Sequence, residues 1–274
     1  MHPALRLQAL ESRAKRRFGQ NFLIDQGVVG RIVRVAGVRT GDHVLEIGPG
    51  LGILTDALVR AGALVTAIEL DRDLAAGIRE SMPAVNLVEG DALKFDLAAL
   101  MPALPDGQGW KVAANLPYNV ATPILMRLLD HGFVSAALMF QREVANRLVA
   151  TPADDAFGAL SVQVQVRARA ECAIELPPGA FHPAPKVHST VVRFEPIAAD
   201  FGVSAAGMAV TAAHFDRVVR AGFAQRRKYV ANSLESAFER PAVDAALAVA
   251  GIAPTLRAER IDLAGWRRLA GALG

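Results

Sequence analysis

The segment Asn-Leu-Pro-Tyr at residues 115–118 follows a short apolar run and carries groups that can hold an amine. The side-chain carbonyl of Asn115 and the backbone carbonyl of Leu116 or Pro117 can accept hydrogen bonds. The ring of Tyr118 offers a flat face on which a base can stack, and proline fixes the geometry of the neighbouring groups. The same residue types also form ordinary turns after buried strands. The segment therefore indicates either an amine-binding site or a plain turn.

Three earlier segments place glycines or carboxylates directly after apolar runs. EIGPGLG (46–52) includes Gly48 and Gly50, and glycines there permit a tight turn and the close approach of a ligand to backbone N–H groups. Dinucleotide enzymes, methyltransferases and plain turns all use such glycines. Glu69 ends the next run, 21 residues after Gly48, and Asp91 ends the one after. Carboxylates at these places can accept hydrogen bonds from ribose hydroxyls and from the adenine amine, so the three segments together favour an adenosine-type cofactor.

If the first three segments bind such a cofactor, the Asn-Leu-Pro-Tyr segment favours chemistry at adenine N6 of a substrate. This exocyclic amine is a poor nucleophile because its lone pair is delocalised into the ring. Acceptors such as the Asn115 carbonyl can hold its hydrogens and let the nitrogen become pyramidal, while Tyr118 stacks a flipped base. No strong general base is needed, since the nitrogen becomes acidic only after it has taken up a methyl group.

The elements that must position these segments alternate along the chain. Short apolar runs predict strands at 43–48, 64–70, 84–91, 111–116, 136–140 and 189–194, and the alternating run 159–176 predicts at least one more. Segments 53–62 and 72–82 predict helices, and Asp71 and Asp73 are expected to be loop carboxylates or helix caps. This order predicts an α/β fold with a Rossmann-like, mostly parallel, doubly wound sheet that binds ligands at the carboxyl ends of its strands.

The chain divides into three predicted parts. A basic arm covers residues 1–20, the α/β domain covers 21–200, and a small all-helical domain covers 205–274. The last begins after a change in composition and carries helical periodicity without a convincing strand. Its predicted helices lie at 214–225, 231–240, 242–251 and 263–273.

Basic residues gather at 1–20 and at 217–228, whereas residues 39–100 contain ten acidic and five basic side chains. This distribution suits a polyanionic partner together with a cationic small ligand, although ordinary solvated surfaces can also carry such charges. The candidates for phosphate contacts are Arg16, Arg17, Arg226, Arg227 and Lys228. For the last three, a capped helix start is the alternative.

Several classes of protein are not expected. No apolar run approaches the length of a membrane span, and no signal core follows the basic N-terminus, so a cytoplasmic, soluble protein without a membrane partner is expected. Cys172 is the only cysteine, which excludes an internal disulfide, and the six histidines lack ligand-like spacing. No metal is expected, and nothing indicates an obligate oligomer, so a monomer is predicted.

The four segments together make the chain similar to class I S-adenosylmethionine-dependent methyltransferases. More specifically, it resembles the ribosomal RNA adenine N6-dimethyltransferase family along nearly its whole length. The blocks that carry the resemblance, in the family's order, are KRRFGQNFLID (15–25), VLEIGPGLGILT, NLPYNVATPIL, FQREVANRLVA (140–150), FGALSVQVQ (157–165), FHPAPKVHSTVVRF (181–194) and FAQRRKYVANSL (223–234). The chain departs from the family's usual residues at Phe157, His188 and Tyr229, where tyrosine, aspartate and threonine are common.

The resemblance implies roles for particular residues. Those implied to bind S-adenosylmethionine are Asn21, Leu23, Gly48, Gly50, Glu69, Asp91 and Asn115. Glu69 would bind the ribose hydroxyls and Asp91 the adenine amine, and Gly48 would lie beside the amino-acid end. The implied catalytic residues are Asn115, Leu116, Pro117, Tyr118 and Phe181. Phe181 would stack on the target adenine opposite Tyr118, or else be a core aromatic after a turn.

Within the family, the C-terminal blocks and Leu116 favour enzymes that dimethylate two adjacent adenosines in a hairpin loop near the 3′ end of 16S ribosomal RNA. The expected partner is this RNA in the small ribosomal subunit or its precursor, with a role in subunit biogenesis. The alternatives are a large-subunit RNA methyltransferase of the macrolide-resistance type and an assembly factor whose catalysis is secondary. A DNA adenine methyltransferase and a nicotinamide-dependent dehydrogenase are disfavoured by the NLPY segment.

Overall fold

The computed structural model describes residues 21–105, 108–152, 154–225 and 227–274. The chain forms two compact units. The first comprises the chain up to Ala145 together with Glu171–Pro196, and the second comprises Asn146–Ala170 together with Ile197–Gly274. The predicted arm at 1–20 lies outside the described residues.

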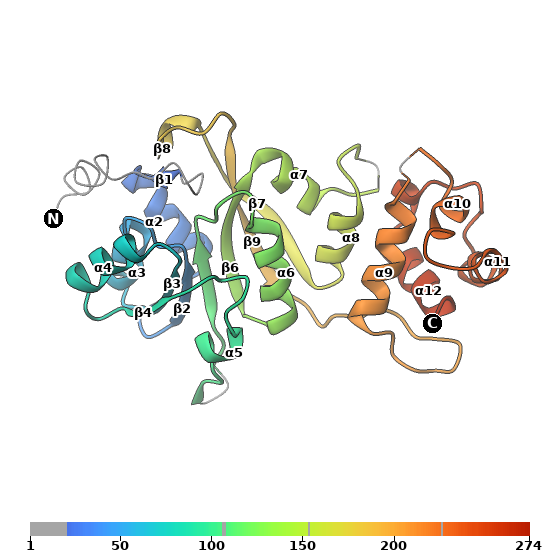
Figure 1. Cartoon of the computed structure of the whole chain (residues 1–274), viewed down its shortest axis with the longest axis horizontal. Coiled ribbons are helices and arrows are strands. Elements are labelled where there is room, and N and C mark those ends of the chain that lie inside the picture. The colour runs from blue at the N-terminus through green and yellow to red at the C-terminus, as the bar shows by residue number, and fades with distance from the viewer. Residues whose placement is uncertain (1–20, 106–107, 153, 226) are drawn as a thin grey trace. The chain divides into compact units, whose positions relative to one another are not determined.

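The first unit is built on a seven-stranded sheet (Figure 1). The strands, in their order across the sheet, are β4 (Asn86–Glu89), β3 (Leu64–Glu69), β2 (His43–Ile47), β5 (Lys111–Ala114), β6 (Ser135–Gln141), β9 (Ser189–Pro196) and β7 (Ala168–Leu176). The strands from β4 to β6 pair in parallel, and β9 pairs antiparallel with β6. The predicted mostly parallel α/β sheet is confirmed.

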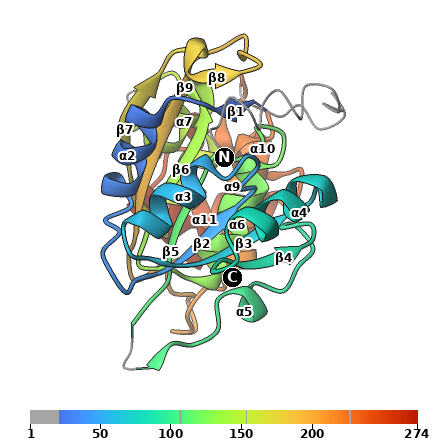
Figure 2. The same ribbon diagram turned by 90° about the vertical axis from the view of Figure 1, so that its left-hand side faces the viewer.

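Helices cover the sheet (Figure 2). Those that precede or alternate with the parallel strands are α2 (Gln26–Val35), α3 (Ile53–Arg60), α4 (Arg72–Ser81), α5 (Leu97–Leu100) and α6 (Ala121–His131). Val44 and Ala113 on the sheet share one buried cluster with Ile32 and Leu58 on the helices. The intervening strand residues are also buried, as expected for parallel strands covered on both faces.

Short polar contacts fix where the helices begin. Asp71 is the N-cap of α4, and its Oδ1 accepts hydrogen bonds from the N–H groups of Asp73 and Leu74 at 2.9 and 3.3 Å. The Asp25 carboxylate caps α2 in the same way. Of the two carboxylates expected to be loop residues or helix caps, Asp71 is confirmed as a cap, and Asp73 lies in the first turn of α4.

The alternating run 159–176 contains a helix as well as the predicted strand. Its second half forms β7, whereas Ala159–Gln165 forms α8. Four successive residues of α8, 161–164, are all buried, so alternation of valine and glutamine does not produce an exposed face. The Gln165 amide instead donates to the carbonyl oxygen of Ala150 at 2.8 Å, which satisfies a polar group that a strand would have placed differently.

The second unit is a helical cluster. Its elements are α8, the C-terminal part of α7 (Arg142–Val149), α9 (Ala212–Phe223), α10 (Val230–Leu234), α11 (Arg240–Ala250) and α12 (Leu263–Ala272). Phe157 and Val162 share its core with Phe215 and Trp266. Residues 146–170 therefore pack with the C-terminal helices, whereas the sequence alone placed them in the first domain. The predicted helix at 231–240 also ends earlier, at Leu234.

A buried ion pair ties α9 to the segment after α8. The Arg167 guanidinium donates to both carboxylate oxygens of Asp216, at 3.2 and 2.9 Å, and also to the Gln163 carbonyl. The Cζ atom of the same guanidinium lies 4.9 Å from the centroid of the Phe201 ring. This fork-shaped pairing satisfies a buried charge, and it explains why a segment distant in sequence belongs to the helical unit.

Candidate active site

A pocket at the carboxyl ends of β2, β3, β4 and β5 brings together most of the predicted site residues. The predicted residues that line it are Asn21, Leu23, Gly48, Gly50, Glu69, Asp91, Asn115, Leu116, Pro117 and Tyr118. All belong to the first unit. This is the edge at which parallel α/β sheets bind ligands.

The glycine loop after β2 follows a path that favours glycine. Gly48 and Gly50 have φ angles of 68° and 56°, in the left-handed region that costs other residues energy. A Cβ added at Gly48 would meet no atom of the other described residues within 4 Å, its two chain neighbours aside, whereas one at Gly50 would press on the Phe22 ring at 3.1 Å. Gly48 thus leaves open space beside its backbone, which suits the close approach of a ligand.

Glu69 at the end of β3 holds the loops on either side of it. Its Oε2 accepts from the Gly50 N–H at 3.0 Å and its Oε1 from the Asp71 N–H at 2.9 Å. Burial raises the pKa of this carboxyl, and the two backbone donors oppose that effect. Each oxygen keeps further acceptor capacity, since a carboxylate oxygen has two lone pairs. Glu69 can therefore fix the glycine loop and accept ligand hydroxyls together.

Glu46 is a pocket residue that was not predicted from the sequence. It lies within β2, is 1% exposed, and its Oε2 has no hydrogen-bond partner among the described residues. Burial raises the pKa of Glu46 to about 8, with a further contribution from the Glu69 charge and an opposing one from the Thr55 hydroxyl. The sequence did contain a sign of it, because Glu46 is a carboxylate among the apolar residues Val44, Leu45 and Ile47.

Asp91 stands at the start of the loop that follows β4. Its Oδ1 accepts from the Leu93 N–H at 2.9 Å, and its side chain is about one-third exposed. Arg127 on α6 donates to the Ala92 carbonyl and, at 2.7 Å, to the Phe95 carbonyl, which fixes the path of the loop. The carboxylate is thereby held at the pocket wall with acceptor capacity left for a ligand amine.

The NLPY segment is both a turn and part of the pocket wall. Asn115 directs its Nδ2 to the Asn21 carbonyl at 3.0 Å, so its Oδ1 is turned to the other side of the amide. The Pro117 carbonyl accepts from the Val120 N–H at 3.1 Å, just before α6 begins. No described donor bonds to the Leu116 carbonyl. The acceptors best placed for an amine are therefore Asn115 Oδ1 and the Leu116 carbonyl oxygen.

Tyr118 is fixed at the tip of its ring. Its hydroxyl lies 2.7 Å from the Ser189 Oγ on β9, and either group can be the donor. Partial burial raises the pKa of Tyr118, and the Ser189 contact opposes this. With both its backbone and its hydroxyl held, the ring has little freedom to turn.

The remaining predicted residues lie elsewhere. Phe181 is in β8 (Phe181–His182), which pairs with β1 (Phe22–Leu23), and it is 3% exposed within the first unit's core. It is not among the pocket-lining residues, so its ring occupies the position of the core-aromatic alternative. Arg227 and Lys228 are exposed on the second unit. Arg16, Arg17 and Arg226 lie outside the described residues.

The pocket fits a cationic nucleoside ligand such as S-adenosylmethionine. Its carboxylates are those of Glu46, Glu69, Asp71 and Asp91, and none of the described lining residues is lysine or arginine. The unpartnered Glu46 oxygen offers an acceptor for an ammonium group. Over the described ranges, no group of three or more histidine, cysteine, aspartate or glutamate side chains has the arrangement of a metal site, and no helix there is long and apolar enough to span a membrane.

Comparison with known proteins identifies the family to which this chain belongs. A crystal structure of a dimethyladenosine transferase from Plasmodium falciparum superimposes with a TM-score of 0.71, at 24% identity, over 90% of this chain and 95% of that chain. The fold is that of a class I methyltransferase. The profile described as "Ribosomal RNA adenine dimethylase" matches residues 11–272. The chain therefore belongs to the ribosomal RNA adenine dimethylase family, whose members methylate adenine in ribosomal RNA with S-adenosylmethionine as donor.

Curated relatives agree with this family. A protein from Magnetococcus marinus named "Ribosomal RNA small subunit methyltransferase A" is 47% identical over 261 residues, which is 93% of this chain and 90% of the relative. One of the same name from Pseudomonas aeruginosa is 42% identical over 268 residues, 96% of each chain. The family resemblance seen in the sequence is confirmed.

Proposed function

We propose that this protein dimethylates N6 of two adjacent adenosines in a hairpin loop near the 3′ end of 16S ribosomal RNA. The observation that carries the proposal is the NLPY wall, where the Asn115 amide is anchored on the Asn21 carbonyl and its carbonyl is left for a substrate amine. The curated relatives described above, which are named for the small-subunit RNA, support this target over the large subunit.

The cofactor residues act as a set of fixed acceptors. Glu69 accepts hydrogen bonds from the ribose hydroxyls of S-adenosylmethionine, and Asp91 accepts one from its adenine amine. The open space beside Gly48 admits the amino-acid end of the same molecule. Asn21 and Leu23 close the pocket from the N-terminal side. S-adenosylmethionine, when bound, supplies an electrophilic methyl group that N6 takes up as the sulfur leaves as a neutral thioether.

Catalysis by the chain's own residues is mainly alignment. Asn115 Oδ1 and the Leu116 carbonyl hold the two N6 hydrogens, and Tyr118 stacks the adenine. Holding reactants in attack geometry can lower a barrier by roughly 7–11 kcal/mol. The same acceptors stabilise the positive charge that develops on nitrogen, and they can hold the single N–H of monomethyladenosine for the second transfer. The stacking role predicted for Phe181 requires its ring to leave the core, so Tyr118 is the primary stacking residue.

The RNA is held by charge on the basic residues. We assign phosphate contacts to Arg227 and Lys228, which are exposed, and to Arg16, Arg17 and Arg226 from the sequence. The proposed enzyme is a monomer that acts on the small subunit or its precursor during biogenesis, and this substrate places it in the cytoplasm.

The decisive experiment is transfer of labelled methyl from S-adenosylmethionine to small subunits that lack these modifications, with large subunits and duplex DNA in parallel. Nucleoside analysis should find dimethyladenosine in small-subunit RNA alone. Label in large-subunit RNA would overturn the target. Tight subunit binding without label would instead indicate an assembly factor.

A further inference from the structure

Tyr229 in the second unit is exposed, although it is a large aromatic residue. Its relative exposure is 48%, and it is the only aromatic among the described large hydrophobic residues on the surface. The other tyrosine, Tyr118, is partly buried and bonded to Ser189. Single exposed aliphatic residues need no explanation, but a tyrosine that is left out of a nearby core is available to a partner.

The backbone beneath Tyr229 is held firmly. Its carbonyl accepts from the Ser233 N–H at 3.1 Å and from the Ser233 Oγ at 3.3 Å. The next residue, Val230, is fully buried and donates its N–H to the Leu256 carbonyl at 2.8 Å. The ring is thus presented from a fixed support, so that little conformational entropy of the backbone is lost when it binds a partner.

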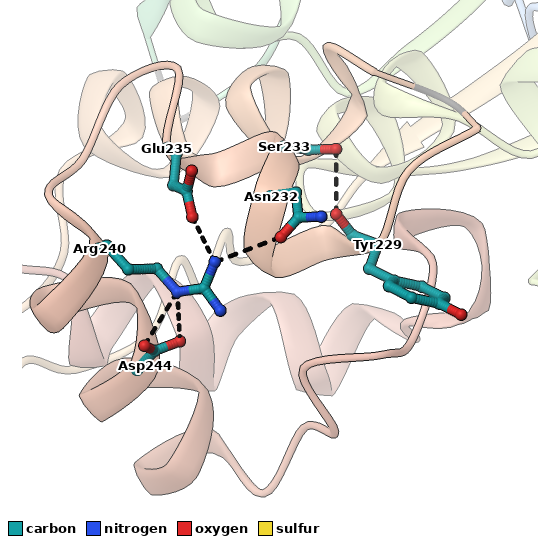
Figure 3. A network of polar contacts seen from close by, with 6 residues as sticks. All are labelled: Tyr229, Asn232, Ser233, Glu235, Arg240 and Asp244. Atoms are coloured by element: carbon teal, nitrogen blue, oxygen red, sulfur yellow. Dashed lines mark hydrogen bonds and ion pairs between the residues drawn. The ribbon is translucent and has the colours of Figure 1, made fainter.

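Two acidic side chains near this turn, Glu235 and Asp244, share the cation of Arg240. Arg240 donates from Nε to both oxygens of Asp244, at 2.9 Å each, and from Nη1 to Glu235 and to the Asn232 side chain. Figure 3 shows this network on one side of α10, with the Tyr229 ring directed away from it. Each of these two carboxylates thus has a cationic partner, which offsets part of the repulsion that they would exert on an anion.

Basic side chains flank the ring along the chain. Arg227 and Lys228 precede Tyr229 and are exposed, and Arg257 follows Leu256, whose carbonyl bonds to Val230. None of the three forms an ion pair with another side chain in the described part of the protein. Cations beside a flat, exposed ring are the combination with which proteins bind unpaired nucleotides, since the cations contact phosphates and the ring stacks a base.

We propose that Tyr229 is a stacking platform for one unpaired nucleotide of the RNA substrate, with Arg227 and Lys228 on the adjoining phosphates. The inference rests on the proposed function, because it takes the partner to be ribosomal RNA. The Tyr229 ring would make a stacking contact that does not depend on charge. The neighbouring Arg227 and Lys228 would make phosphate contacts that do.

The test is the affinity of the full chain for small subunits that lack the methylations, measured at several salt concentrations. Tyr229→Ala should weaken binding by about 5- to 150-fold with an unchanged salt slope, as expected for one lost stacked base. Tyr229→Phe keeps the ring and should bind within about twofold of the natural protein. Arg227→Ala should instead lower the slope of log K against log salt by about 0.7–0.9.

Two further measurements separate stacking from other causes. Tyr229→Leu keeps an apolar side chain, so it should bind as weakly as Tyr229→Ala if the ring face matters. A photo-crosslinking amino acid at position 229 should attach to RNA. Unchanged affinity of both Tyr229→Ala and Tyr229→Leu, or crosslinks to ribosomal protein alone, would overturn the platform. Absence of methyl transfer by the natural protein would overturn the proposed function instead, so the two failures are distinguishable.

Discussion

The pocket of the first unit and the surface around Tyr229 in the second unit both carry charged side chains, but these side chains differ in burial. In the pocket, Glu46 and Glu69 are almost inaccessible to solvent. Around Tyr229, the side chains of Arg240, Glu235 and Asp244 are about half exposed. Because water screens exposed charges and not buried ones, we expect mutations in the pocket to have large, pH-dependent effects and those on the surface to have small, salt-dependent ones.

Glu46→Gln offers the largest expected change. The folded-state pKa of about 8 exceeds the ordinary value of 4.5. Between these two pH values the unfolded chain loses a proton that the folded protein retains, so this residue destabilises the folded protein progressively as pH rises from about 4.5 to 8. Glutamine resembles the neutral acid, and it should remove a cost that reaches at most about 5 kcal/mol at pH 8.

Urea unfolding of the protein without ligands at pH 5 and pH 8 measures this effect. The difference in stability between the variant and the natural protein should grow with pH in favour of the variant. If the difference in stability is the same at pH 5 and pH 8, Glu46 has an ordinary pKa, and burial does not control the effect of the mutation. Glu80→Gln on α4 is a suitable control, because Glu80 is exposed.

Asp216→Ala tests whether the loss of stability depends on how deeply a polar group is buried, and not on the unit to which it belongs. Asp216 lies in the second unit, like Arg240, but its partner Arg167 has a side chain only 3% exposed. Removing one partner of a buried pair typically costs about 3–5 kcal/mol. Urea unfolding should report this loss, and the double variant Arg167→Met with Asp216→Leu should recover part of it. A cost that disappears at high salt would contradict the role of burial.

The pocket also shows which features a sequence can predict. Asn115, Glu69 and Asp91 were predicted because each is a polar residue directly after an apolar run, where a parallel sheet gathers its ligands. Glu46 was missed because it lies inside a strand, where only burial reveals its orphaned oxygen. The position of Phe181 was left open, since packing in the β1–β8 pair decides whether the ring faces the core.

Packing likewise explains the errors in the fold. The alternation in 159–165 is typical of a strand with one exposed face, but the segment forms α8, in which the four successive residues 161–164 are all buried. The first unit's parallel sheet was predictable because strand and helix alternate in sequence. The extent of the second unit was not, because the Arg167–Asp216 pair joins residues 49 positions apart.

Asn115→Ala should affect chemistry with little effect on RNA binding. Loss of one preorganised group that stabilises developing charge typically lowers kcat by about 100- to 1000-fold. Methyl transfer to unmodified small subunits should fall to this extent, while subunit affinity stays within about twofold of normal. Equal losses in both would remove Asn115 from the chemistry. Asn86→Ala is a matched control, since Asn86 lies on β4, is not among the pocket-lining residues, and its side chain bonds only to the Thr66 hydroxyl among the described residues.

Arg240→Ala should have the smallest effect, although Arg240 bonds to more of the described side chains than Asp216 does. Hydrogen bonds from Arg240 to Glu235 and Asp244 raise its pKa, so it remains charged, but exposed pairs contribute little because water competes for both partners. We expect the melting temperature to fall by no more than about 3 °C at low salt. The difference should shrink further at 1 M salt, where screening acts within about 3 Å. A large, salt-independent loss on calorimetry would show that geometry, and not burial, governs these polar clusters.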